Sequence, residues 1–203
     1  MSGTELERPS LGLAEWVRPF VVVALLVSAM WTEEVVDLLP HTNFDQWGIR
    51  PRQVVGLVGI PLAPFLHAGF GHLIGNTVPF LVLGCLIAAS GLVRYLQVSA
   101  LIAVVSGVGT QLVDPAHTDH IGASSVVFGY LTYLLARGFY QRNVGYLIVG
   151  VVVLFFYGGI LWGVLPHEGI SWQGHVFGAV GGVVAARVLH HQARPATATT
   201  SPD

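Results

Sequence analysis

The sequence is poor in charged residues. Charged side chains make up only 10% of the 203 residues, whereas an average soluble domain carries about 25%. Lysine is absent, and all nine basic residues are arginine. Hydrophobic residues reach 53%, and the formal net charge is -2. This composition excludes an ordinary soluble domain, and the charge provides no basic surface for nucleic acid.

Cysteine is nearly absent as well. The one cysteine, Cys85, cannot form an internal disulfide, so a small domain held together by disulfides is excluded. It lies inside an apolar run, where a cysteine acts as a small apolar residue. The chain also lacks an internal repeat, which argues against an architecture built from repeated units.

Apolar runs, in contrast, are abundant. Each is near the roughly 20 residues that a helix needs to cross a bilayer. They lie at about 18–36, 73–90, 96–113, 122–136, 144–164 and 173–189. We therefore expect an all-α membrane protein with six transmembrane helices and a long outer loop, roughly 37–71, between the first two.

The arginines indicate the orientation of this bundle. If the N-terminus is cytoplasmic, only Arg50 and Arg52 lie on the outer side, as the positive-inside rule requires. We expect a multi-pass protein of a prokaryotic plasma membrane with both termini in the cytoplasm. Its predicted parts are a cytoplasmic N-terminal segment (1–14), the six-helix domain (15–191) and a disordered tail (192–203).

The fourth apolar run is short for a membrane span. From Gly122 to Arg137 a helix rises roughly 22 Å, whereas the hydrocarbon core is about 30 Å thick. Its outer end must then begin below the membrane surface. Ser124 is expected about 20 Å above the inner boundary.

Polar residues of two other runs are expected near the same depth. His175 lies about 18 Å above Arg187, and Asn76 lies about 21 Å above the inner end of its own run. His72 is one turn further out. Polar groups inside a membrane usually mark function, so this layer is the predicted site.

These residue types suit acyl transfer. A serine hydroxyl becomes a nucleophile when a neighbouring base accepts its proton, and His175 can serve as that base for Ser124. The developing oxyanion needs donors, which the Asn76 amide, a His72 ring N–H and the Ser124 backbone N–H can supply. Gly122 lets the backbone turn into the short helix.

Small residues allow the two helices to approach. Gly174, Gly178 and Gly182 recur every four residues in the last run, a pattern that permits close backbone packing. Phe128, one turn below the serine, can lie against the His175 ring. Small residues form a similar edge on the fourth run: Gly122, Ser125 and Gly129.

Three motifs on these runs resemble those of rhomboid intramembrane serine proteases. HAGFGHLIGN at 67–76 fits the HxxxxHxxxN motif of that family, and GASS at 122–125 fits its GxSx motif. GHVFGAVGG at 174–182 is similar to the histidine and glycine pattern of its last core helix. The order of the motifs also matches, and the resemblance covers about residues 15–191.

The resemblance implies a Ser124–His175 dyad that needs no acid, no metal and no cofactor. It makes Ser125 a packing residue and Phe128 the aromatic ring that stacks on the histidine. The implied partners are the lipid bilayer and single-pass transmembrane substrates, which the family cuts near the outer face, beside small residues. Nucleic acid is not an expected partner, and the oligomeric state stays open.

Two other functions fit parts of the sequence. A rhomboid-like module that binds membrane proteins without cutting them is expected to lack the serine or the histidine, and both are present. A metal-dependent enzyme or transporter using His67, His72 and His175 lacks an HExxH motif. We interpret His67 as structural.

The acids of the outer loop are not expected to complete a catalytic triad. Asp114 and Asp119 lie above the serine layer, so we do not expect either to contact the histidine as a third catalytic member.

The fifth run, together with the segment 167–172, is the candidate gate for substrate entry. Its bulky residues are Phe155, Phe156 and Trp162.

Overall fold

A computed structural model describes residues 12–116, 118–142, 144–156 and 171–191. These ranges are mainly helical and contain no strand. The long helices are α1 (Leu13–Asp37), α3 (Phe70–Ala88), α4 (Leu92–Val113), α5 (Ser124–Gln141), α6 (Val144–Phe156) and α8 (Trp172–His191). Shorter helical turns are η1 (Phe44–Trp47), η2 (Val54–Val58), α2 (Gly59–Leu62) and η3 (Ala63–Phe65). By length and composition, α1, α3 and α4 can cross a membrane.

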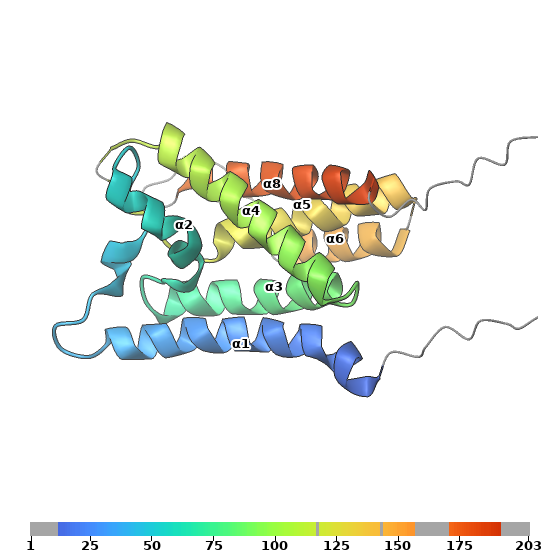
Figure 1. Ribbon diagram of the computed structural model, residues 1–203, viewed down its shortest axis with the longest axis horizontal. Helices are drawn as coiled ribbons and strands as arrows, with labels where there is room; N and C mark the ends of the chain where they lie inside the picture. The colour runs from blue at the N-terminus through green and yellow to red at the C-terminus, as the bar shows by residue number, and fades with distance from the viewer. Residues whose placement is uncertain (1–11, 117, 143, 157–170, 192–203) are drawn as a thin grey trace, which may run out of the picture.

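The long helices form one bundle (Figure 1). α1 lies beside α3, while α8 packs most extensively on α5 and α4, and α6 packs on α5. The described ends of the chain, the start of α1 and the end of α8, lie at the same end of the bundle. α2 and its neighbouring turns lie at the other end, where α5 and α8 begin.

The fourth run is longer than the sequence indicates. α5 continues to Gln141 and ends where Arg142 adopts a left-handed conformation, with φ of 50°. The prediction that this helix ends at Arg137 is therefore wrong. The Arg137 guanidinium instead donates to Ser90 Oγ at 2.6 Å and lies 4.8 Å from the centre of the Tyr146 ring, so its charge is accommodated within the helix.

The fifth run is described only in part. α6 covers its first residues, and Phe155 is 81% exposed on this helix. The rest of the candidate gate lies outside the description: the Phe156 side chain, Trp162 and the segment 167–170. The predicted N-terminal segment up to residue 11 and the predicted tail, 192–203, also lie outside the described residues.

The long connection between α1 and α3 is folded onto the bundle. Ile49 and His120 exchange two backbone hydrogen bonds of 2.9 and 3.0 Å. The Gln111 side chain at the end of α4 donates to Gln53 O at 2.7 Å, and Arg52 N donates to Gln111 O at 3.0 Å. These contacts attach the connection to α4 and to the segment that leads into α5.

His67 attaches the end of this connection to the start of α5. Its Nδ1–H donates to Phe65 O at 3.1 Å, and its Nε2 accepts the backbone N–H of Ala123 at 3.5 Å. Both bonds require a neutral ring with the proton on Nδ1. The side chain is 2% exposed. Burial, and to a lesser degree the charge of His72, lowers the pKa of His67 to about 4.

The backbones of α5 and α8 approach each other closely. A Cβ added to Gly178 would collide with the backbone oxygen of Ser125, and one added to Gly182 would collide with the backbone oxygen of Gly129. Thr132 Oγ1 on α5 donates to Ala179 O on α8 at 2.8 Å. The two backbones are therefore in direct contact, which only glycine at these two positions of α8 allows.

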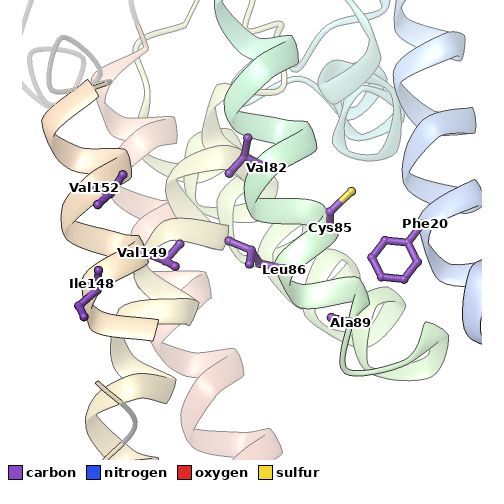
Figure 2. A pocket seen from close by; sticks show the side chains of 8 residues that line it. All are labelled: Phe20, Val82, Cys85, Leu86, Ala89, Ile148, Val149 and Val152. Atoms are coloured by element: carbon purple, nitrogen blue, oxygen red, sulfur yellow. The ribbon is translucent and has the colours of Figure 1, made fainter. Parts of the chain in front are cut away.

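An apolar cavity of about 520 Å³ lies between α1, α3 and α6 (Figure 2). Val82 and Leu86 line it from α3, Ile148 and Val152 line it from α6, and Phe20 lines it from α1. α6 contacts α5 closely at Gly150, where an added Cβ would strike Leu135. Hence α6 is packed against α5 but leaves space toward α3.

The glycine contact predicts a loss of stability in Gly178→Ala. The added methyl group has no space against a backbone atom, so overpacking should cost about 1–3 kcal/mol. Thermal unfolding in detergent should therefore show a midpoint several degrees lower. The matched control is Gly75→Ala in α3, where an added Cβ meets no atom outside its own helix. A Gly178→Ala variant as stable as this control would contradict the contact.

His67 predicts a pH dependence of stability. Its pKa in the folded chain, about 4, lies below the ordinary value of 6.5, so the unfolded chain binds the extra proton between these pH values. The free energy of unfolding should therefore fall as the pH decreases from about 6.5 to about 4. His67→Gln, which keeps a donor and an acceptor but does not titrate, should lose less over this range. If the free energy of unfolding changes with pH to the same extent in both proteins, His67 does not contribute to this pH dependence.

Candidate functional site

A serine and a histidine from α5 and α8 are in hydrogen-bond contact. Ser124 Oγ lies 2.7 Å from His175 Nε2. For the hydroxyl to donate along this contact, Nε2 must be the unprotonated ring nitrogen. His175 is 8% exposed and Ser124 is half-buried, so the pair is largely shielded from bulk water. This is the arrangement in which a base can accept a proton from a serine nucleophile.

Ser124 is positioned by the turn that precedes α5. It is the first residue of the helix, so its backbone N–H is among those without a partner inside the helix. Gly122 has a φ of 110°, a value that residues with a side chain rarely adopt. Its N–H donates to Ala63 O at 2.7 Å. An added Cβ would also lie 2.6 Å from the His72 ring. Both the backbone conformation and the lack of space therefore require glycine at position 122.

His175 is positioned by the first turn of α8 and by an aromatic ring. Its backbone N–H donates to Ser171 O at 3.3 Å. The Phe128 ring on α5 stacks on the imidazole, with ring centres 4.6 Å apart and an angle of 23° between the planes. Phe128 is one turn after Ser124, so a single face of α5 carries both groups that contact the histidine.

His72 and Asn76 lie on the first turns of α3. His72 Nδ1 accepts the backbone N–H of Ala68 at 3.4 Å, so the neutral ring carries its proton on Nε2, beside Gly122. Asn76 is 6% exposed, and its Nδ2 donates to His72 O at 3.1 Å. These two bonds therefore do not use the second amide hydrogen of Asn76 or the Nε2–H of His72.

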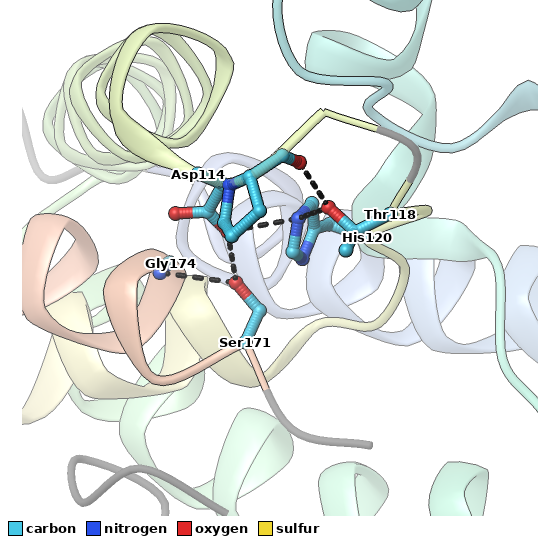
Figure 3. Close-up of polar contacts among 6 residues, drawn as sticks. Asp114, Thr118, His120, Ser171 and Gly174 are labelled. Carbon is cyan, nitrogen blue, oxygen red and sulfur yellow. Dashed lines mark hydrogen bonds and ion pairs between the residues drawn. The ribbon is translucent and has the colours of Figure 1, made fainter. Parts of the chain in front are cut away.

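A second polar cluster joins the end of α4 to the segments that precede α5 and α8 (Figure 3). Asp114, which is fully buried, accepts from His120 Nε2 at 2.8 Å and from Ser171 Oγ at 3.1 Å. Thr118 Oγ1 also contacts His120 Nε2 at 2.8 Å. Burial raises the pKa of Asp114 and lowers the pKa of His120, while the attraction between the two opposes both shifts.

Sequence reasoning missed the role of Ser171 in this cluster. Its Oγ accepts the backbone N–H of Gly174 at 3.2 Å, so it caps the N-terminus of α8. A serine two residues before the last apolar run is a signal that could have identified this cap. Asp119, in contrast, is exposed and pairs with Arg50 at 2.9 Å.

Three other residues predicted from the sequence, Ser125, Gly182 and His67, lie against backbone atoms. Ser125 faces α8 through its backbone oxygen, against Gly178, and Gly182 lies against the next turn of α5. His67 contacts the backbone of Ala123 rather than the serine. Within the described ranges, no three histidine, cysteine or acidic side chains are grouped in a way that could hold a metal ion.

The chain matches known proteins over most of its length. A family model described as the rhomboid domain matches residues 52–192. An uncharacterized protein of Mycobacterium tuberculosis is 43% identical over 192 residues, which cover 90% of this chain and 80% of that protein. An uncharacterized protein of Mycobacterium leprae is 42% identical, over 86% of this chain and 72% of that protein.

A more distant relative carries a functional name. The "Putative rhomboid protease YdcA" of Bacillus subtilis is 30% identical over 119 residues, which cover 58% of this chain and 59% of that protein. The family model covers the segment that holds Ser124, His175, His72 and Asn76. The predicted resemblance to the rhomboid family is therefore confirmed, and this helical membrane protein belongs to that family.

Proposed function

We propose that this rhomboid protein is an intramembrane serine endopeptidase that cuts the transmembrane segments of single-pass membrane proteins near the outer face. The observation that carries the proposal is the 2.7 Å contact between Ser124 Oγ and His175 Nε2, in a site largely closed to bulk water. Family membership supports the same activity. The catalytic pair is Ser124 as nucleophile and His175 as general base.

The first step is acylation of the serine. Ser124 Oγ attacks the carbonyl carbon of the scissile peptide while its proton moves to His175 Nε2. The carbonyl oxygen becomes an oxyanion in the tetrahedral intermediate. The donors proposed for this oxyanion are the Ser124 backbone N–H, the His72 Nε2–H and the free amide hydrogen of Asn76. Each is fixed in the protein before the charge develops.

The second step releases the two fragments. The imidazolium gives its proton to the leaving amine as the C–N bond breaks, which leaves an ester on Ser124. Water then attacks this ester while His175 accepts its proton and returns it to Ser124 Oγ. The stacked Phe128 ring restrains the plane of the His175 ring through both proton transfers. The cycle therefore needs no group beyond those of the chain and one water.

Substrate entry is proposed between α3 and α6. A transmembrane segment must reach the serine sideways from the lipid, so part of the bundle has to open. The apolar cavity between these helices supports this route, because α6 packs on α5 and leaves space beside Val82 and Leu86 of α3. The fifth span, with Phe155, is the proposed gate.

The proposed membrane arrangement has six spans and both termini in the cytoplasm. It is supported by the common position of the two described chain ends and by the arginine distribution. The relatives named above are bacterial proteins, which supports a prokaryotic plasma membrane as the location. The protease domain is proposed to extend over residues 15–191, and its partners are single-pass substrates and the bilayer.

Ser124→Ala should reduce cleavage to background, whereas Ser125→Ala should retain most of it. The two serines are adjacent but lie about 100° apart around the helix, and Ser124 contacts His175. The measurement is cleavage of a single-span reporter in liposomes, together with labelling by a fluorophosphonate probe. Background cleavage by the wild type itself would favour a non-cleaving, membrane-protein-binding module, whereas equal cleavage above background by wild type and Ser124→Ala would contradict Ser124 as the nucleophile.

Asn76→Ala and His72→Ala should each lower the turnover number by about 100- to 1000-fold, the usual effect of removing one oxyanion donor. Both variants should remain folded, with the reporter bound as before. Steady-state kinetics of the same liposome reaction would measure the turnover number and the KM separately. Wild-type turnover in Asn76→Ala would remove the amide from the proposed oxyanion site.

A further inference from the structure

Asp114 lies between the segments that lead into the two proposed catalytic residues. It is the C-cap residue of α4, directly after Val113, and it is fully buried. Both of its bonds within Figure 3 run to Oδ2, one from His120 and one from Ser171. Burying a carboxylate costs free energy unless it is paired. The two donors therefore stabilise Asp114, and Asp114 in turn fixes the positions of His120 and Ser171.

On one side the carboxylate supports the start of α8. Ser171 donates its hydroxyl to Asp114 and accepts the Gly174 N–H, so the cap of the helix is itself held in place. The Ser171 carbonyl accepts the backbone N–H of His175. The negative charge also lies near the positive end of the α8 dipole, where it is stabilising. Asp114 thereby sets the first turn of α8, which carries His175.

On the other side the carboxylate supports the entry to α5. His120 lies four residues before Ser124, as Ser171 lies four residues before His175. His120 Nε2 donates to Asp114, and the His120 backbone pairs with Ile49 in both directions. The strand-like segment before Ser124 is thus held between Asp114 and the connection from α1.

We propose that Asp114 is a positioning residue that aligns Ser124 with His175 by holding His120 and Ser171 on one carboxylate oxygen. This rests on the proposed protease function. It differs from the role of a triad acid, because Asp114 acts through the backbones of two segments and not by a bond to the catalytic imidazole. A small shift between the two helices is sufficient to matter, since a misplacement of about 1 Å can cost roughly 100-fold in rate.

The test compares Asp114→Ala and Ser171→Ala with the control Asp119→Asn, an exposed acid of the same loop. The rate of fluorophosphonate labelling at Ser124 is measured over a range of probe concentrations, which separates the maximal rate constant from probe affinity. Asp114→Ala should lower the maximal rate constant about 10- to 100-fold with affinity unchanged. Ser171→Ala, the milder change, should lower it less, and Asp119→Asn should stay within about twofold.

A swap tests the contact itself. In the double variant Asp114→Ser with Ser171→Asp, the carboxylate and the hydroxyl exchange places, and aspartate is also a good N-cap for α8. The double variant should label faster than Asp114→Ser alone. A merely stabilising role predicts slower labelling only in proportion to the unfolded fraction, which thermal unfolding in detergent measures for every variant.

A second measurement does not need activity. The ¹⁵N chemical shift of His175 Nε2, assigned by its loss in His175→Gln, reports the hydrogen bond from Ser124. Asp114→Ala should shift it toward the value found in Ser124→Ala. An unchanged shift, or wild-type labelling by folded Asp114→Ala, would overturn the positioning role. A wild type that the probe never labels would instead contradict the proposed protease function, while the NMR comparison still decides the role of Asp114.

Discussion

The site depends first on how closely two helices can approach inside a membrane. Burial of apolar surface does not bring helices together there, because lipid tails are as apolar as the side chains. Contact comes from small residues, and Gly178 and Gly182 let α8 reach the backbone of α5. The Thr132 bond to Ala179 fixes the register of the pair. The distance between Ser124 Oγ and His175 Nε2 follows from this contact between backbones.

Helix geometry explains why part of the site could be read from the sequence. A rise of 1.5 Å per residue put Ser124 and His175 at one depth, and the structure has them 2.7 Å apart. The same arithmetic failed at the C-terminal end of α5, because Arg137 does not end this helix. A charged residue can remain within a helix when a neighbour such as Ser90 accepts its donors, and a single sequence does not reveal that partner.

Long-range contacts account for what could not be predicted. The connection between α1 and α3 takes its path from Gln111 and from the pairing of Ile49 with His120, residues that are far apart in the chain. The position of Asp114 in the sequence predicts no direct contact with the histidine, but it does not reveal the bond that Asp114 accepts from Ser171. Its bond to Ser171 spans 57 positions of sequence, so spacing alone could not bring the two together.

The stack of Phe128 on His175 has a consequence for entropy. An imidazole with one face against another ring keeps its plane, so free rotation about its χ2 bond is lost, and of the two flipped states that remain the bond to Ser124 favours the one with Nε2 toward the hydroxyl. This loss of rotamer freedom occurs once, when the chain folds, and is included in the folding free energy. No further ordering of that side chain is then required when a peptide bond arrives.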